Sequence, residues 1–154
     1  MKKICLFLLI LLCFTTTGFA EIQNQESQKP WKYCEEIRGF ADTKTESMLT
    51  ALNNDNYTDF SRDFNQQMRE SIPVNKFGEM TAIIKSKFGK YISMEFVGIE
   101  IRENYITVVY KGKFSQGQDS VLIRSIFTQD NGKIVVAGFW LTPLTAAGNT
   151  EAGK

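Results

Sequence analysis

The stretch that decides the fold is YISMEFVGIEIRENYITVVYKGKFSQGQDSVLIRSIFTQDNGKIVVAGFWL, residues 91–141. Apolar and polar residues alternate along most of it, which is the period of two typical of β-strands. Turn signals divide it at Glu103-Asn104, in the loop around Gly117 and at Asn131-Gly132, and the last is the strongest short hairpin signal. The pattern predicts four antiparallel strands in a meander.

Because a hairpin turn fixes the register of its strands, the residues on each face of the sheet can be predicted. One face is apolar throughout, and we expect it to be the inner face. Its expected members are Val97, Ile99, Ile101, Ile106, Val108, Tyr110, Ile123, Ser125, Phe127, Val136, Gly138 and Trp140. Ile92, Met94 and Phe96 have the opposite parity, so a bulge near Val97-Gly98 is needed to keep both sets inside. A bulge bends its strand, which predicts a curved sheet.

The other face is also unusually apolar for a sheet surface in contact with water. The register assigns to it Val109, Leu122, Ile126, Val135, Ala137, Phe139 and Leu141, together with Lys111 and Arg124. Such a face is expected to be covered, either by the chain's own tail or leader or by a second copy of the protein. Arg124 is expected opposite Phe139, where a guanidinium over a ring suits a partly polar interface. The predicted interface residues are Val109, Leu122, Arg124, Ile126 and Phe139.

Upstream of residue 91 the apolar spacing changes to three and four, which is typical of amphipathic helices. A long helix is predicted from Pro30-Trp31 to residues 53–56, followed by one or two short helices before Pro73 interrupts. A further helix, capped by Asn75, is expected to end at Gly89. The predicted fold class is α+β, with three N-terminal helices packed on a strongly curved four-stranded antiparallel meander.

The N-terminus has the layout of a secretory signal peptide. Lys2 and Lys3 precede an apolar run that ends at Phe14, and small residues end at Ala20. We therefore predict a signal peptide at 1–20, a flexible leader at 21–32, one domain at 33–142 and a disordered tail at 143–154. The protein is expected to be exported, periplasmic or secreted, and to have no stable membrane anchor after cleavage.

Charge and residue types exclude several kinds of site. Loss of Lys2 and Lys3 changes the formal net charge from +1 to −1, and the remaining charges are interspersed, so no nucleic-acid partner is predicted. Without histidine or a cysteine cluster, no metal site and no cofactor are predicted. Cleavage leaves Cys34 as the one cysteine, expected to pack as a small apolar residue, with an intermolecular disulfide or a nucleophile as alternatives.

Three segments carry a resemblance to a known superfamily: ALNNDNYTDF (51–60), KFGKY (87–91) and DNGKIVVAGFW (130–140). With the predicted architecture, they resemble the nuclear transport factor 2-like fold, also called cystatin-like or ketosteroid-isomerase-like. They are similar to its small exported members, which are grouped as a domain of unknown function. The resemblance covers residues 34–141 and implies a cone-shaped domain, and related folds often dimerise through the sheet. None of its motifs is a catalytic signature.

Enzymes of that superfamily place a general base, usually Asp or His, beside hydrogen-bonding Tyr or Asp residues inside the cone. Here the expected inner face contributes Tyr110, Ser125 and Trp140 as polar groups. Asp63, in the short helices, is the acid we would pair with Tyr110 at the cone mouth. The predicted ligand-binding residues are therefore Tyr110, Ser125, Trp140 and Asp63, and no catalytic residue is assigned.

Three functions remain open on these observations. The preferred one is an exported non-catalytic domain that binds a small apolar ligand or a protein partner as a homodimer. The alternatives are a small enzyme of the isomerase or dehydratase type that uses a carboxylate in the cone, and a structural accessory module with a filled cone. A buried Asp or Glu within hydrogen-bond reach of Tyr110 would overturn this preference in favour of the enzyme, and the volume inside the cone separates the other two.

Overall fold

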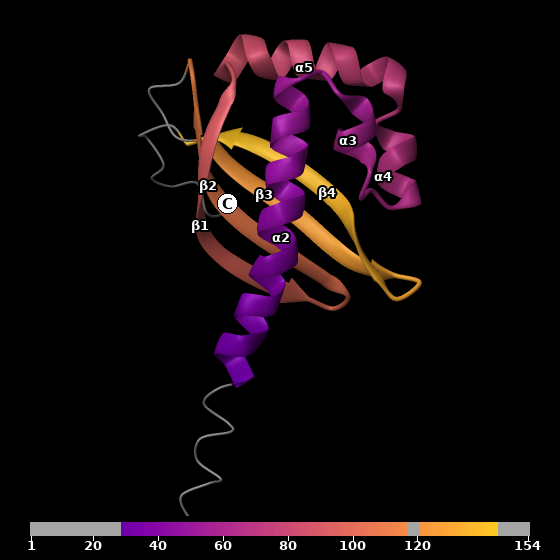
Figure 1. The fold of residues 1–154 in the computed structure, drawn as a ribbon, viewed down its shortest axis with the longest axis vertical. Coiled ribbons are helices and arrows are strands. Elements are labelled where there is room, and N and C mark those ends of the chain that lie inside the picture. The colour runs from indigo at the N-terminus through magenta and orange to yellow at the C-terminus, as the bar shows by residue number, and fades with distance from the viewer. Residues whose placement is uncertain (1–28, 117–120, 145–154) are drawn as a thin grey trace, which may run out of the picture. The chain divides into compact units, whose positions relative to one another are not determined.

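The computed structural model describes residues 29–116 and 121–144. The described elements, in chain order, are α2 (Lys29–Asn53), α3 (Tyr57–Ser61), α4 (Gln66–Ser71), α5 (Val74–Phe88), β1 (Tyr91–Arg102), β2 (Tyr105–Phe114), β3 (Val121–Asp130) and β4 (Lys133–Pro143). The strands form one antiparallel sheet in the order β1-β2-β3-β4 (Figure 1). The predicted α+β class with a four-stranded meander is confirmed.

The chain divides into two units, Met1–Glu36 and Ile37–Lys154, and apart from Cys34 the description below concerns the second. The predicted signal peptide (1–20), most of the predicted leader and residues 145–154 of the predicted tail lie outside the described residues. The last four leader residues, 29–32, belong to α2. No described helix combines the length and the apolar character needed to cross a membrane.

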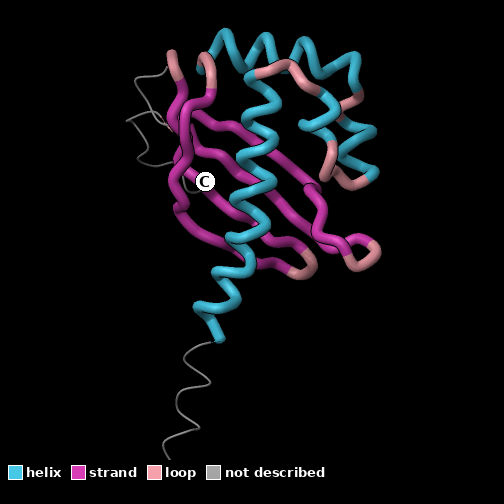
Figure 2. Tube along the Cα trace, in the orientation of Figure 1, coloured by secondary structure: helices cyan, strands magenta, loops and turns pink. Residues whose placement is uncertain are grey.

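The sheet is curved and open, and α2 crosses its concave face (Figures 1 and 2). The buried stripe of α2 includes Ile37, Ala41 and Leu49, at the spacing that one helix face requires. Cys34 precedes this stripe and is exposed, so the expectation that it packs is wrong. The segment between α3 and α4 extends the sheet at β4, because Phe64 forms a parallel bridge with Val136.

Aromatic side chains fill the space between helices and sheet. Phe60 is fully buried, and its ring centroid lies 5.0 Å from those of Phe64 and Phe77 and 6.3 Å from that of Phe139. Phe127 is also fully buried and contacts Phe40 edge-on at 5.4 Å. Burying large rings supplies much of the hydrophobic stabilisation available to a domain of this size.

The bulge predicted at Val97-Gly98 is confirmed. The register between β1 and β2 shifts between Phe96 and Gly98, so that Phe96 pairs with Tyr110 and Ile99 pairs with Val108. Phe96 and Ile99 both contact the core despite their opposite parity in the sequence. The extra residue, Val97, is exposed. Ile92 is exposed too, because a second register shift between Tyr91 and Ser93 leaves it without a partner on β2, so its expected inward placement is wrong.

A bulge in β4 was not predicted. It moves the side chains in the second half of that strand to the opposite faces of the sheet. Phe127 pairs with Val136 as expected, but Ile126 then pairs with Gly138, which leaves Ala137 as the extra residue. Every later residue therefore changes face. The placement of Trp140 on the inner face is wrong, and so is the placement of Phe139 on the outer one.

The physical reason lies in the space available on each side of β4. Phe139 packs against Phe60 in the core, where a ring of its size fits. Trp140 is 52% exposed on the outer face, and its cross-strand neighbour is Arg124. The expected pairing of Arg124 with Phe139 is therefore also wrong, because the register is shifted by one residue and Arg124 pairs with Trp140.

Local capping explains the helix boundaries. The side chain of Asn56 accepts from the backbone N–H of Asp59 at the start of α3, and Asn65 accepts from Met68 at the start of α4. Gly89 ends α5 with a φ of 78°, as predicted. Asn75 does not cap α5, because the helix begins one residue before it and Pro73 holds the cap position.

Candidate functional site

Two of the predicted site residues, Tyr110 and Ser125, lie on adjacent strands of the inner face of the sheet, and both bond to α2. The Tyr110 hydroxyl donates to Oδ1 of Asp42 over 2.9 Å, and the Thr45 hydroxyl donates to that of Ser125 over 2.8 Å. Tyr110 is 1% exposed, and Thr45 and Ser125 are fully buried. The middle of the concave face therefore carries polar groups, but they are bonded to the helix that covers them.

Asp42 links the buried Tyr110 hydroxyl to the surface. Its Oδ2 accepts from Nη2 of Arg38 at 3.3 Å, one helical turn earlier. The Arg38 guanidinium also lies 4.6 Å from the centroid of the Phe96 ring, a cation–π contact. Both carboxylate oxygens of Asp42 are thus engaged, although 38% of the side chain remains exposed.

The environment keeps the Tyr110 hydroxyl protonated. Burial raises the pKa of Tyr110 well above its ordinary value, and the hydrogen bond and negative charge of Asp42 raise this pKa further. The hydroxyl is therefore a hydrogen-bond donor throughout the physiological pH range. Asp42 accepts this hydrogen bond and is ion-paired with Arg38.

A second tyrosine repeats this arrangement near the start of β1. The Tyr91 hydroxyl donates to Oε2 of Glu46, and burial followed by the contact with Glu46 raises the pKa of Tyr91. The side chain of Asn53 bonds the backbone of Tyr91 on both sides, accepting from its N–H at 2.9 Å and donating to its carbonyl at 2.8 Å. The amide thus pairs with the first residue of the edge strand as another strand would.

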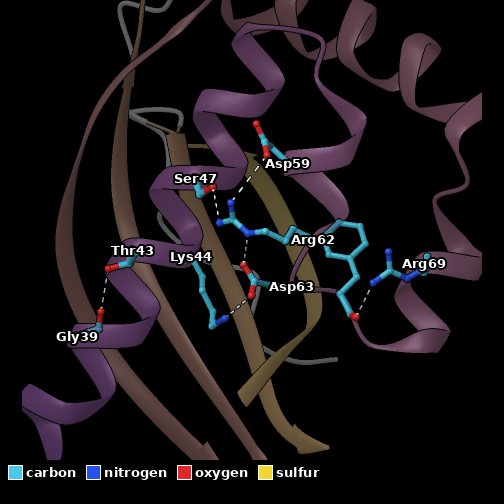
Figure 3. A network of polar contacts seen from close by, with 9 residues as sticks. Gly39, Thr43, Lys44, Ser47, Asp59, Arg62, Asp63 and Arg69 are labelled. Atoms are coloured by element: carbon cyan, nitrogen blue, oxygen red, sulfur yellow. Dashed lines mark hydrogen bonds and ion pairs between the residues drawn. The ribbon is translucent and has the colours of Figure 1, made fainter. Parts of the chain in front are cut away.

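Asp63, the fourth predicted site residue, belongs to a different network (Figure 3). It forms an ion pair with Lys44 on α2, and its Oδ2 accepts from Nε of Arg62 at 3.4 Å. Arg62 also donates to the Ser47 hydroxyl at 3.0 Å and lies 3.8 Å from a carboxylate oxygen of Asp59. The structure therefore does not bring Asp63 to Tyr110, and its side-chain partners tie the end of α3 to α2.

An open groove of about 490 Å³ runs beside this network. It is lined by Thr43, Glu46, Ser47, Thr50, Ala51, Asn54, Asp59 and Arg62. The volume suits a small ligand. The one guanidinium that lines the groove, that of Arg62, is already bound by Asp59, Asp63 and Ser47.

The outer face of the sheet carries four of the five predicted interface residues. Val109, Leu122 and Ile126 are half-buried there, and Arg124 is exposed. Trp140 replaces Phe139 as the aromatic residue of this face. The exchange strengthens the apolar character of the surface, because an exposed indole offers more contact area than a phenyl ring.

Three residues of α2 that contact the inner face were not predicted from the sequence: Arg38, Asp42 and Thr45. They recur at intervals of four and three along the helix, on the side that also buries Ala41. A polar residue within a buried helical stripe is unusual, and this signal could have identified Thr45, whereas Arg38 and Asp42 lie at the edge of the stripe and are partly exposed. Which sheet residues they would meet could not be read from that spacing.

Residues 45–136 match the family described as Protein of unknown function (DUF3887). The chain belongs to this family. The DUF3887 match contains Thr45, Asp63, Tyr110 and Ser125, whereas Asp42 and Trp140 lie outside it. A search of curated proteins finds no match for the chain.

For this DUF3887 protein, metal chemistry receives no support from the geometry. Within residues 29–116 and 121–144, no three Cys, Asp or Glu side chains are grouped so that they could hold a metal ion. The polar groups instead satisfy one another, and in the same ranges no buried side-chain nitrogen or oxygen lacks a hydrogen-bond partner. Chemistry in the interior would therefore require breaking bonds that the fold makes.

Proposed function

We propose that this protein is an exported, non-catalytic domain of the nuclear transport factor 2-like type that binds a protein partner on the outer face of its sheet. The observation that carries the proposal is the half-exposed Trp140 on that face, beside Arg124 and close to half-buried aliphatic side chains. Surfaces that combine an accessible Trp, an Arg and apolar neighbours are typical of protein interfaces. A second copy of the chain, as expected from the sequence, is one such partner.

The contents of the cone argue against a ligand site there. Phe60 and Phe127 are fully buried, and Tyr110 and Ser125 are bonded to α2. A small apolar ligand would have to displace these rings or separate α2 from the sheet. This favours recognition outside the cone and agrees with the accessory-module alternative, in which the sheet face alone is used.

A second candidate, an enzyme of the isomerase or dehydratase type, is favoured by one observation. Asp42 lies within hydrogen-bond distance of Tyr110, an arrangement that proton abstraction next to a carbonyl could use. We rank this candidate lower for two reasons. Both oxygens of Asp42 are bound, and the 1% exposure of Tyr110 leaves no surface for a substrate.

The proposal is tested by native mass spectrometry and sedimentation of the mature protein purified from its own exported compartment. Wild type is compared with Trp140→Asp and with Ile83→Asp, a control that alters an exposed apolar residue on α5. A stoichiometric protein complex that survives in Ile83→Asp and is lost in Trp140→Asp supports the proposal. A monomer with no bound protein, or a complex that Trp140→Asp leaves intact, contradicts it.

A further inference from the structure

We infer that the partner recognised by the outer face is an acidic segment of another protein, one that when extended presents carboxylates and apolar side chains on the same face. This inference rests on the proposed function and names the chemistry of the partner. Three features of the outer face carry it: how Trp140 is held, which charges surround it, and how the apolar residues are spaced between them.

The six-membered ring of Trp140 lies over Gly138. A Cβ at position 138 would overlap two atoms of the Trp140 six-membered ring and lie 3.5 Å from Cβ of Ile126. The indole therefore occupies the space that a glycine leaves free two residues away on the same strand. Glycine inside a strand weakens it and often marks a place of close approach. A side chain fixed in this way loses little rotamer freedom when a partner binds.

Basic side chains extend from the centre of this face to the end of β2. Lys111 and Lys113 on β2 and Arg124 on β3 are exposed, and in the described ranges none of them takes part in an ion pair. Carboxylates on the same face lie toward its margins. Glu95 and Glu100 are on the edge strand β1.

These carboxylates leave much of the basic surface available. Glu95 is the cross-strand neighbour of Lys111, and Glu100 is paired with Arg102. Arg124 has Val109 and Trp140 as its own cross-strand neighbours. The strip formed by Lys111, Lys113 and Arg124 thus attracts an anion beside the indole.

The apolar residues of the face are spaced between these charges. Leu122 and Ile126 flank Arg124 at two residues on either side, and Val109 is its neighbour on β2. An extended partner segment has its side chains on one face at a similar repeat. Carboxylates over the basic strip and apolar side chains over Leu122, Ile126 and Trp140 would match this surface.

Two other occupants fit less well. A second copy would bring the same basic strip against Lys111 and Arg124, and like charges across an interface are unfavourable. An anionic membrane would satisfy the charge, but peripheral binding uses apolar side chains that enter the headgroup region. The indole of Trp140 lies along the sheet over Gly138 instead.

The test follows the indole N–H resonance of Trp140 in the ¹⁵N-labelled mature protein, identified by its loss in Trp140→Phe. The probes are the eight-residue peptide Leu-Ser-Glu-Ser-Leu-Ser-Glu-Ser, which when extended presents Leu and Glu on one face, the same peptide with Lys in place of Glu, and phosphatidylglycerol vesicles. We expect the acidic peptide to shift this resonance saturably. Arg124→Glu should weaken that binding at least tenfold, and the control Lys76→Glu, which reverses an exposed charge on α5, less than twofold.

Gly138→Ala is an independent test, because it displaces the indole without changing any charge. We expect it also to weaken binding of the acidic peptide at least fivefold. Far-UV circular dichroism checks that each variant is folded, and the Arg124 variant keeps the test valid if Gly138→Ala unfolds. Equal binding of the two peptides, or no response to the acidic one, overturns the inference.

Two outcomes separate the inference from the proposed function. A wild-type dimer that Trp140→Asp dissociates overturns the acidic partner and supports the proposed function. Trp140-dependent binding of vesicles without binding of the acidic peptide overturns both.

Discussion

The Tyr110 hydroxyl and Oδ1 of Asp42 lie 2.9 Å apart, and this hydrogen bond joins the middle of the sheet to α2. Its two ends differ in environment, because Tyr110 is almost fully buried while Asp42 also contacts Arg38 near the surface. The bond therefore anchors the helix that closes the concave face. It gives the buried phenol a partner without burying an unpaired charge.

Removing the Tyr110 hydroxyl should destabilise the fold modestly. Tyr110→Phe keeps the ring and loses one hydrogen bond to a partly solvated carboxylate, so we expect the free energy of unfolding to fall by about 1–2 kcal/mol. Urea denaturation followed by circular dichroism measures it. Tyr105→Phe, which alters an exposed tyrosine, should change the free energy by less than about 0.5 kcal/mol. A similar loss in both variants would contradict this assignment.

Stability should decrease at high pH because of the same hydroxyl. The pKa of Tyr110 is raised in the folded state above the ordinary value of 10.0, so the unfolded state releases its proton first. The contribution of this hydroxyl to the free energy of unfolding is complete below pH 10 and is lost as the pH rises above 10. Urea midpoints between pH 8 and 11 should therefore fall in wild type and fall less steeply in Tyr110→Phe. Parallel profiles for the two proteins would refute the prediction.

The buried hydroxyl pair Thr45 and Ser125 should behave as one unit. Thr45→Val or Ser125→Ala alone leaves the other hydroxyl buried without its partner, which costs about 1–3 kcal/mol. The double variant leaves no unpaired hydroxyl, so its loss should be smaller than the sum of the single losses by at least about 0.5 kcal/mol. A double-mutant cycle of urea unfolding measures this coupling. Strict additivity would show that the two hydroxyls do not interact.

The Lys44–Asp63 ion pair should contribute more than an exposed pair. Its side chains are 21% and 23% exposed, whereas those of Arg102 and Glu100 are 81% and 54% exposed. We expect Asp63→Asn to cost about 1–2 kcal/mol and Arg102→Gln less than about 0.5 kcal/mol. Thermal unfolding at low and high salt compares the two variants. Equal losses would mean that partial burial adds nothing to the Lys44 contact.

Two glycines with the same φ allow steric strain to be separated from backbone strain. Gly89 and Gly132 both have a φ of 78°, but a Cβ at Gly89 would overlap Oγ of Ser115 and lie 2.7 Å from the backbone nitrogen of Gln116. At Gly132 nothing lies within 4 Å. Gly132→Ala should cost about 1 kcal/mol, and Gly89→Ala at least about 2 kcal/mol. Calorimetric unfolding of both variants measures the two losses of stability. If the neighbours of Gly89 could move away freely, Gly89→Ala would cost no more than Gly132→Ala.

Much of the fold follows from local patterns. Alternation and turn chemistry predicted the meander, and the parity conflict around Val97 predicted the bulge in β1, because both effects act over a few residues. Asn131-Gly132 forms the predicted turn, with φ values of 49° and 78° that suit these two residue types. The glycine at the end of α5 was predicted for the same reason.

The candidate site was only half predicted. Tyr110 and Ser125 were placed correctly on the inner face, but their partners Asp42 and Thr45 were not identified. Those partners are 68 and 80 residues away along the chain. No local pattern specifies which turn of a helix meets which strand residue, since that depends on how α2 crosses the sheet.

The sequence by itself determined the elements, their order and the register from Phe96 to Val136, because propensity, periodicity and turn geometry are local. The tertiary structure alone decided the faces of Phe139 and Trp140. The segment VVAGFW (135–140) is apolar at every position except glycine, so either parity buries apolar side chains. The choice came from packing, since Phe60 receives the ring of Phe139 in the core and Gly138 leaves room for the indole of Trp140 outside.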